Sequence, residues 1–546
     1  ARALEAVAPL LDQDDFDHVQ QGVEVLLSLG DRILIEDLVD GCRLDDHGAV
    51  FAGRNIWRRV EEDHWEWVTL RLMLEAGQLS APRCLKTCEP QVLSDQRLRG
   101  MLSSLEELRL FEYGSLPDLS VLAEMPRLRL LDLEDCFEIT DLSPICSLQH
   151  LEELRLRECE LLADLQPLVA LGRLRRLTLD SCTQPMDLSP LGQLTGLQAL
   201  SIQAEPELSD LSWLSALSAL EVLSLSGNDG LTDLSPLSAL SRLRALDLSD
   251  CGALSDLSVL TALPALRELD LCGCRALSDF SPLSSLTLLR ALDVTQCSGV
   301  SDLSPLGRLV GLEALELGWL DDVTALPVLS SLLRLSALKL DTCEALSDLS
   351  VLARLSQLST LGLCGCPSLS DLSVLSSLPK LSSLAVELCE SMTELSAIAA
   401  LSSLQRLSLH GLDLARGEHA KLSGLTGLLQ LAVTMDDALS ELGWIVALTG
   451  LRVLNLSENE RLSDIGPLAV LSELEELDLG GCTSLTDLSP LAALPRLRRL
   501  RLCDCTALAD ISALQLVTTL RELDVTGCPL PDPHPLEDVA DLHLIS

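Results

Sequence analysis

The chain has 546 residues, of which 47% are hydrophobic and only 2% aromatic, and its 82 acidic residues outnumber 39 basic ones for a formal net charge of -43. Such an acidic surface repels the phosphate backbone of nucleic acids, so we expect no nucleic acid partner and favour a protein partner with a basic surface. Polar residues interrupt every leucine run before it reaches the ~18–20 residues of a membrane span, so we expect no membrane contact. We expect a soluble monomer or weak oligomer.

Residues 1–104 do not share the pattern of the rest of the chain. Apolar side chains recur at helical spacing in three stretches, 4–11, 23–29 and 33–39, which predicts a helical N-terminal region. Two roles remain open for this region. It is either a cap that covers the open end of a solenoid, as terminal units require, or a separate docking module.

From Leu105 onward a leucine-rich sequence pattern repeats with a period of 23 residues. The copy LRALDLSDCGALSDLSVLTALPA begins at Leu243, and its residues define positions 1 to 23 of the repeat. One extra residue precedes Leu428, after which the period resumes. Units of this length cannot bury a core alone and must stack, which predicts a solenoid over residues 105–546. The nineteen copies begin at Leu105, Leu128, Leu151, Leu174, Leu197, Leu220, Leu243, Leu266, Leu289, Leu312, Leu335, Leu358, Leu381, Leu404, Leu428, Leu451, Leu474, Leu497 and Leu520.

Each repeat combines a strand pattern with a turn pattern. The alternation L-x-x-L-x-L predicts a short parallel strand with Leu246 and Leu248 inward and Asp247 outward. Ser258, at position 16, is the predicted N-cap of one helical or 3-10 turn, and Pro follows it in many repeats. Position 14 is nearly always acidic, and we expect these carboxylates to bind backbone N–H groups of the turn. They include Asp141, Asp164, Asp187, Asp210, Asp233, Asp256, Asp279 and Asp302.

Nineteen cysteines are present, and twelve of them occupy position 9. Periodic placement predicts buried, reduced thiols and a reducing compartment, so we expect a cytoplasmic protein. Spacing alone leaves a bridge between adjacent repeats open. The twelve are Cys136, Cys159, Cys182, Cys251, Cys274, Cys297, Cys343, Cys366, Cys389, Cys482, Cys505 and Cys528.

The repeats resemble leucine-rich repeats, since they match L-x-x-L-x-L-x-x-N/C-x-L over residues 105–546. The segment S-D-L-S-P-L-x-x-L is similar to the repeats of bacterial internalins and related short-helix types. This resemblance implies an α/β solenoid with a parallel sheet on its concave face and short helical or 3-10 turns on its convex face. It also implies a protein that binds other proteins.

The outward positions of the strands are where a partner would bind. Position 5 holds Asp247, Asp270, Asp293 and Glu316 in four successive repeats. Like charges ~5 Å apart repel and stabilise nothing, which makes this run a candidate binding stripe for a basic partner. The alternative is a solvated acidic face of a very acidic protein.

Two irregular repeats supply further candidates. Trp319 replaces the usual polar residue at position 8, close in sequence to Glu316, and Trp is common among interface anchors. Structural repair of an irregular repeat is the alternative. The repeat that contains the extra residue carries His410, Arg416, His419 and Lys421, an unusual basic group in a segment that breaks a regular scaffold. We place His410 among the candidate partner-binding residues.

No nucleophile, metalloprotease or phosphate-loop motif is present, and the C-x-C pairs that start at Cys272, Cys364 and Cys503 lack the spacing of a zinc site. We therefore expect no catalytic residues, metal or cofactor. The sequence favours a non-catalytic scaffold that binds a protein partner on a concave, acidic face. The alternative is the ligand-sensing leucine-rich repeat portion of a larger bacterial receptor or regulatory protein.

Overall fold

The computed structural model describes residues 95–111, 119–530 and 543–545, with gaps at 183–185, 206–207, 320–322 and 413, and shorter segments before residue 95. The chain divides into two compact units, 1–266 and 267–546, and each is described by itself. Apart from isolated positions, the helical stretches expected between residues 4 and 39 lie outside the described residues.

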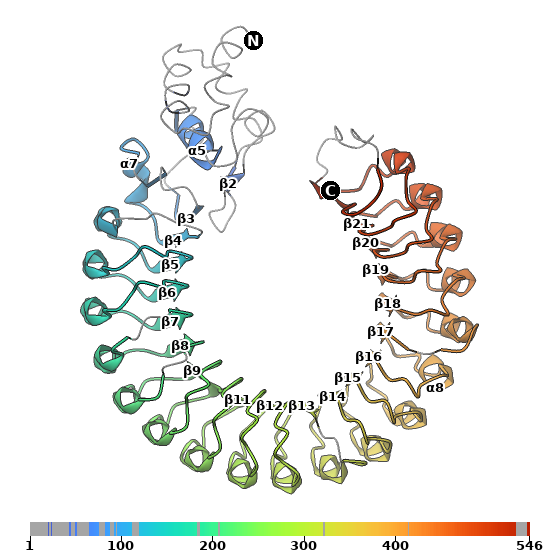
Figure 1. The fold of residues 1–546 in the computed structure, drawn as a ribbon, viewed down its shortest axis with the longest axis horizontal. Helices are drawn as coiled ribbons and strands as arrows, with labels where there is room; N and C mark the ends of the chain where they lie inside the picture. Colours follow the sequence, from blue (N-terminus) through green and yellow to red (C-terminus); the bar gives the residue numbers. More distant parts are fainter. Residues whose placement is uncertain are drawn as a thin grey trace. The chain divides into compact units, whose positions relative to one another are not determined.

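Unit 1 contains a parallel sheet whose strands follow one another at intervals of one repeat (Figure 1). Its strands are β3 (Cys84–Thr87), β4 (Glu107–Leu110), β5 (Leu130–Glu134), β6 (Glu153–Arg157), β7 (Arg176–Asp180), β8 (Ala199–Gln203), β9 (Val222–Ser224) and β10 (Ala245–Asp247). Between them lie 3-10 segments η2 (Leu119–Glu124), η3 (Ser143–Ser147), η4 (Gln166–Ala170), η5 (Ser189–Gln193), η6 (Ser212–Ala216), η7 (Ser235–Ala239) and η8 (Ser258–Ala262). Ahead of the repeats stand the antiparallel pair β1 (Arg43–Leu44) and β2 (Val50–Phe51), with helices α5 (Trp65–Glu75) and α7 (Arg99–Leu102).

Unit 2 repeats the same arrangement. Its strands are β11 (Glu268–Asp270), β12 (Ala291–Val294), β13 (Ala314–Gly318), β14 (Ala337–Asp341), β15 (Thr360–Cys364), β16 (Ser383–Glu387), β17 (Arg406–His410), β18 (Gln430–Thr434), β19 (Val453–Asn455), β20 (Glu476–Asp478), β21 (Arg499–Arg501), β22 (Glu522–Asp524) and β23 (His543–Ile545). Its helical turns are η9 (Ser281–Ser285), η10 (Ser304–Arg308), η11 (Pro327–Ser331), η12 (Ser350–Arg354), η13 (Ser373–Ser377), α8 (Ser396–Ala399), η14 (Glu418–Gly424), η15 (Gly443–Ala447), η16 (Gly466–Val470), η17 (Ser489–Ala493) and η18 (Ser512–Leu516).

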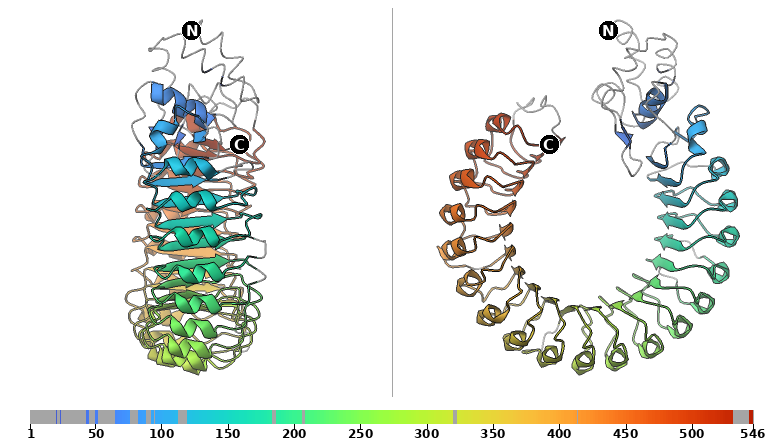
Figure 2. Two further views of the ribbon diagram at one scale, coloured as in Figure 1. Left: turned by 90° about the vertical axis from the view of Figure 1, so that its left-hand side faces the viewer. Right: turned by 180° about the vertical axis from the view of Figure 1, so that it is seen from behind.

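The predicted fold class is confirmed in both units. Within each unit the strands line the concave side and the 3-10 turns line the convex side (Figures 1 and 2). Successive strands pair in parallel with a shift of one repeat, as in Leu246 opposite Leu223. The register also pairs Cys84 with Glu107, so a strand of the sheet precedes the repeat that begins at Leu105. Within the described part of the chain, no helix has the length and apolar character needed to cross a bilayer.

Cys and Asn side chains at position 9 close the turn by donating hydrogen bonds to backbone carbonyl oxygens. The Asn228 side-chain amide donates to the carbonyl oxygens of Ile202 at 2.8 Å and Leu225 at 2.7 Å. The buried Cys251 thiol donates to the Leu225 carbonyl oxygen at 3.2 Å. Burial raises the pKa of Cys251 to about 11, which keeps the thiol protonated and able to donate. Cys and Asn can therefore replace each other at position 9, because both donate inward to a backbone carbonyl oxygen, here that of Leu225.

The acidic column at position 14 starts the 3-10 turn. The Ser258 backbone N–H donates to Asp256 Oδ1 at 2.8 Å, and the Ser258 hydroxyl donates to Oδ2 at 3.1 Å. The expected role of the acidic column is confirmed, but the predicted N-cap at Ser258 is wrong. Ser258 is the first residue of η8 and the carboxylate two residues earlier caps the turn. Equivalent bonds to backbone N–H groups are accepted by Asp141, Asp164, Asp187, Asp210, Asp233, Asp279 and Asp302.

Position 8 takes the chain through the left-handed region. Asp250 has a φ of 55° and Gly227 a φ of 73°, and other repeats place similar angles at the same position. A residue with a Cβ atom adopts this conformation at a cost of roughly 1–2 kcal/mol. Large side chains at position 8 are therefore not required by the turn itself.

Glu205 occupies position 9 where most repeats have Cys or Asn. Its side chain is buried, and its Oε1 accepts a hydrogen bond of 2.7 Å from the Cys182 backbone N–H. Its own N–H donates to Asn228 Oδ1 at 3.0 Å. Burial is the main reason that the pKa of Glu205 rises to about 8. An ionised carboxylate is therefore unfavourable at this place in the folded chain.

We predict that Glu205 makes the stability of unit 1 depend on pH. Because its pKa is higher in the folded chain than the ordinary 4.5, folding binds a proton between these values and stability falls as pH rises from about 4.5 to about 8. Glu205→Gln retains the acceptor and removes this loss. At pH 9 the variant should be more stable than wild type by a few kcal/mol, since each pKa unit corresponds to about 1.36 kcal/mol.

The measurement is urea denaturation of both proteins at several pH values between 5 and 9. Glu138→Gln, a change of an exposed carboxylate in another turn, controls for net charge. A stability difference between wild type and Glu205→Gln that stays constant across this pH range would contradict the assignment.

Candidate protein-binding surfaces

Three of the four predicted stripe residues are neighbours in unit 2. Register places Asp270 of β11 beside Asp293 of β12, and Asp293 beside Glu316 of β13. The fourth residue, Asp247, lies on β10 of unit 1 and is described only there. The acidic run of unit 2, Asp270–Asp293–Glu316, is named the acidic stripe below.

The stripe carboxylates are partly engaged by their own strands. Asp293 Oδ1 accepts hydrogen bonds from the Thr295 backbone N–H at 2.8 Å and from the Thr295 hydroxyl at 2.7 Å. Asp270 Oδ1 accepts one from the Cys272 backbone N–H at 2.9 Å. Burial, and to a smaller extent the charge of Glu316, raises the pKa of Asp293 above its ordinary value. Hydrogen bonds thus fix the Asp270 and Asp293 side chains in place. Among the described residues, no basic side chain forms an ion pair with Asp293.

A lysine ends the acidic stripe. Lys339 on β14 lies opposite Glu316 in the register, and its Nζ is 3.1 Å from Glu316 Oε2. Sequence reasoning overlooked this pair because it followed one sign of charge along position 5. The next strands have small residues at that position, Gly362, Ala385 and Ser408.

Trp319 follows β13 directly and is 43% exposed. Its backbone N–H donates to the Asp341 carbonyl oxygen at 2.9 Å, and its φ is 57°. The tryptophan therefore stands in the left-handed position 8 of its repeat, where the backbone would accept glycine more readily. Leu320, Asp321 and Asp322, which follow Trp319 in the sequence, lie outside the described residues.

His410 does not lie beside the acidic stripe. It is on β17, four strand spacings from β13, which corresponds to ~19 Å at ~4.8 Å per strand. Its Nδ1 is 2.8 Å from the Thr434 hydroxyl. His419 is buried, with Nε2 2.8 Å from Asp436 Oδ2 and its ring stacked on Trp444 at 6.0 Å.

The prediction of a basic surface cluster around the extra residue is therefore wrong. His419 packs in the interior, and Lys421 forms an ion pair of 2.7 Å with Glu418. The Glu418 carboxylate also accepts a hydrogen bond from the Leu395 backbone N–H at 2.9 Å. Arg416 is exposed and His410 is half-buried, so the four side chains do not form one cationic site.

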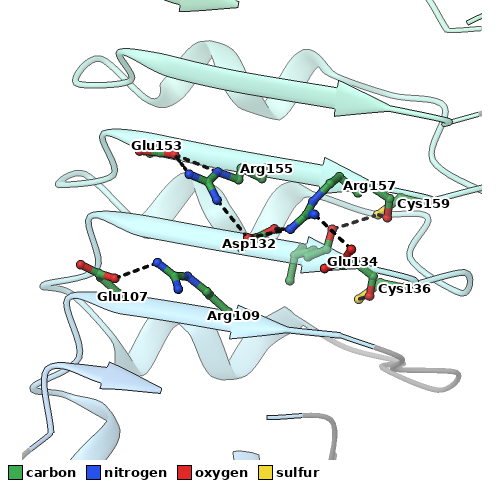
Figure 3. Close-up of polar contacts among 10 residues, drawn as sticks. Glu107, Arg109, Asp132, Glu134, Cys136, Glu153, Arg155, Arg157 and Cys159 are labelled. Carbon is green, nitrogen blue, oxygen red and sulfur yellow. Dashed lines mark hydrogen bonds and ion pairs between the residues drawn. The ribbon is translucent and has the colours of Figure 1, made fainter. Parts of the chain in front are cut away.

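The concave face of unit 1 carries paired charges that sequence reasoning missed (Figure 3). Asp132 on β5 is 3% exposed and accepts two hydrogen bonds from Arg157 Nη2, at 2.9 and 3.0 Å. Arg155 Nη1 lies 3.5 Å from the same carboxylate and Arg155 Nη2 2.5 Å from Glu153. Arg157 also pairs with Glu134 at 3.0 Å. Opposite charges 23 or 25 residues apart in the sequence are the signal that would have revealed this network.

A groove runs along one edge of unit 2, where the chain turns after strands β16 to β21. It has a volume of about 950 Å³. Position 8 of six successive repeats and position 10 of the last four line it, together with Leu412 at position 9. This edge groove is lined by Leu388, Gly411, Leu412, Met435, Asp437, Glu458, Glu460, Gly481, Thr483, Asp504 and Thr506.

The described residues show no metal centre. No group of three or more His, Cys, Asp or Glu side chains among them is arranged so that it could hold a metal ion. Their surfaces offer charge patterns, an exposed tryptophan and an elongated groove, which are features suited to binding.

We predict that Asp132 is required for the stability of the charge network on β5 and β6. Asp132→Ala leaves the guanidinium groups of Arg155 and Arg157 without their shared partner, so local stability should fall by roughly 1–3 kcal/mol. Hydrogen exchange of the β5 and β6 amides measures this change. Arg176→Ala, which removes only an exposed ion pair of 3.1 Å with Glu153, should cost less than ~1 kcal/mol. Equal effects of the two substitutions would contradict a special role for Asp132.

Comparison with known proteins supports the repeat type. A family model described as leucine-rich repeats (two copies) matches residues 218–262, 449–493 and 472–516. No curated protein matches the chain. Among solved structures, the chain is similar to an internalin of Listeria monocytogenes, InlF, with 28% identity and a TM-score of 0.45, covering 58% of this chain and 83% of that one.

Two further structures have lower identity. A leucine-rich repeat protein of Leptospira interrogans has 19% identity and a TM-score of 0.43, over 78% of this chain and 98% of that one. The functional domain of InlJ from Listeria monocytogenes, which includes a cysteine ladder, has 20% identity and a TM-score of 0.40, over 62% and 70%. The family-model matches confirm leucine-rich repeats in the three matched stretches of the predicted solenoid.

Proposed function

The chain is a leucine-rich repeat protein, and on this premise we propose that it is a non-catalytic scaffold that binds a protein partner with a basic surface. Leucine-rich repeat proteins generally mediate contacts between proteins. The observation that carries the proposal is the register of Asp270, Asp293 and Glu316 on adjacent strands of one concave face. A basic partner surface would relieve the repulsion between these carboxylates.

Preorganisation supports binding at the acidic stripe. The Asp270 and Asp293 carboxylates already accept hydrogen bonds from backbone N–H groups two residues later. Side chains held in this way lose little conformational entropy when a partner binds. Trp319 is the proposed apolar anchor at the rim, since it is exposed and follows the strand that carries Glu316. His410, four strands away, would contact only a partner that extends along the sheet.

We also propose that the protein works in a reducing compartment such as the cytoplasm. Cysteines at position 9 are reduced thiols that donate to backbone carbonyl oxygens, as Cys297 does to Leu271 and Cys482 to Leu456, each at 3.2 Å. Burial raises the pKa of Cys297 to about 12, which preserves this donor. A disulfide would remove the S–H groups that make these bonds.

The expected result is that position-9 cysteines are reduced in the native protein. Cells that make it naturally are lysed in denaturant containing N-ethylmaleimide, and labelled thiols are located by mass spectrometry. The half-buried Cys272 and Cys364 outside this column serve as the comparison within the chain. Disulfides between neighbouring position-9 cysteines would contradict the proposed compartment.

Neutralising the acidic stripe tests the proposed function. The triple variant Asp270→Asn, Asp293→Asn, Glu316→Gln keeps oxygen acceptors for the backbone bonds but removes three charges. Partner binding should weaken by about tenfold or more, since each exposed ion pair contributes ~0.5–1 kcal/mol. Affinity capture from the native lysate, with mass spectrometry of each recovered protein at two salt concentrations, measures the change.

Asp478→Asn is the matched control. Asp478 occupies the same strand position and accepts an equivalent bond from the Gly480 backbone N–H at 2.9 Å, but Arg501 lies 3.8 Å from it. Proteins recovered by wild type and by Asp478→Asn should be lost with the triple variant. Equal recovery by all three would remove the acidic stripe from consideration.

A further inference from the structure

The edge groove is a second surface, separate from the concave face. Position 8 of six successive repeats forms one row of its lining, and position 10 of the last four forms another. Six repeats give five spacings of ~4.8 Å, so the groove extends over ~24 Å. An extended peptide advances ~3.3 Å per residue, and about seven residues would therefore fill it. The neighbouring strands β16 to β21 are labelled in Figure 1.

Glycines hollow one part of the groove and apolar side chains line another. Gly411 and Gly481 have φ values of 57° and 70° and leave position 8 without a side chain. Leu388 and Met435 occupy the same left-handed position with φ values of 52° and 54°. Leu388 reaches over Gly411, where an added Cβ would come within 2.7 Å of Leu388 Cδ2.

Leu388 and Met435 are not explained by the fold. They are 47% and 53% exposed, so about half of each side chain's surface remains in contact with water. Both also adopt a backbone conformation that glycine accepts more readily, as Gly411 and Gly481 do in neighbouring repeats. With Leu412, which is 5% exposed, they form an apolar end of the groove.

The remaining part of the groove is acidic. Asp437, Glu458, Glu460 and Asp504 are exposed and line it, and no Lys or Arg is among the lining residues. In the part of the chain that the structure describes, no ion pair involves any of these four carboxylates. By contrast, Arg499 on the nearby concave face is paired with Glu476 at 2.7 Å and Glu522 at 3.2 Å.

We propose that the edge groove binds an extended peptide segment of a partner protein, about seven residues long, with apolar side chains followed by Lys or Arg. The apolar side chains would cover Leu388, Leu412 and Met435. The cations would pair with Glu458, Glu460 and Asp504. This proposal is independent of the acidic stripe, because the two surfaces share no residue.

A defined peptide probe tests the proposal on the full chain. The probe is a fluorescein-labelled nonapeptide with Leu and Phe in one half and Lys and Arg in the other, with a benzophenone crosslinker at its centre. Fluorescence anisotropy should show saturable binding, and the crosslinks should fall on residues 388–506. Probes that carry only the apolar half or only the cationic half should bind at least tenfold more weakly, because each forfeits one end of the groove.

Two double variants separate the contributions of the groove. Leu388→Gly with Met435→Gly removes the apolar end while placing a residue already found at position 8 in adjacent repeats. Glu458→Gln with Glu460→Gln removes two charges without changing side-chain size. Each should weaken binding of the probe roughly tenfold. Unchanged circular dichroism and thermal transition would show that the variants remain folded.

Matched controls lie at the same repeat positions outside the groove. Thr342→Gly changes position 8 and Glu344→Gln changes position 10 of one repeat outside the groove, and neither should alter the affinity. The neutralised acidic stripe should also bind the probe as wild type does. Crosslinks outside residues 388–506, equal affinity of the groove variants and wild type, or equal binding of the purely cationic probe would each overturn the proposal.

Discussion

The hydrogen bond from position 9 to the preceding strand is the interaction on which the repeat depends. A chain that leaves a strand and turns inward would bury the strand's last carbonyl oxygen without a donor, at a cost of ~1–3 kcal/mol. Asn459 supplies the donor for the Val433 carbonyl oxygen at 2.7 Å, and Cys482 supplies it for Leu456 at 3.2 Å. In repeats such as these, the position-9 side chain satisfies a carbonyl oxygen of the repeat before it, so the two repeats depend on each other.

This dependence keeps successive repeats in register, and the register decides what the surfaces become. Residues at one position stack ~4.8 Å apart on neighbouring strands, so a run of charge in the sequence becomes a row of charge in space. The result differs between the units. In unit 1 Asp132 lies between arginines and is neutralised, whereas in unit 2 Asp293 lies between Asp270 and Glu316. The same stacking rule thus pairs opposite charges around Asp132 and places like charges side by side in the acidic stripe, which ends in the Glu316–Lys339 ion pair.

Features that repeat could be predicted from the sequence, and features that occur once could not. The strand, the inward leucines and the acidic cap follow from columns, because the same contact recurs in many repeats. Ser258 was misassigned because Ser before the turn is an equally good local cap, and only the 2.8 Å bond to Asp256 decides between them. His419 was misplaced because its burial depends on Asp436, a single substitution at position 9 in the following repeat.

The edge groove belongs to the second kind, since it depends on which repeats have glycine at position 8 and which do not. No local sequence pattern around Gly411 predicts the hollow. It forms because Leu388 and Met435 flank Gly411 from the repeat before it and the repeat after it.

Unpaired charge and exposed apolar surface have different weight as signs of function. A solvated carboxylate such as Glu458 costs the folded chain little in water, so acidity alone is compatible with a surface that has no partner. An exposed leucine or methionine in a left-handed turn is different, because glycine at the same place would relieve backbone strain and remove apolar surface from contact with water. Trp319, Leu388 and Met435 are all of this second kind. They lie on the edge where the strands end. At this edge, as on the concave face, the chain carries side chains that its own stability does not require.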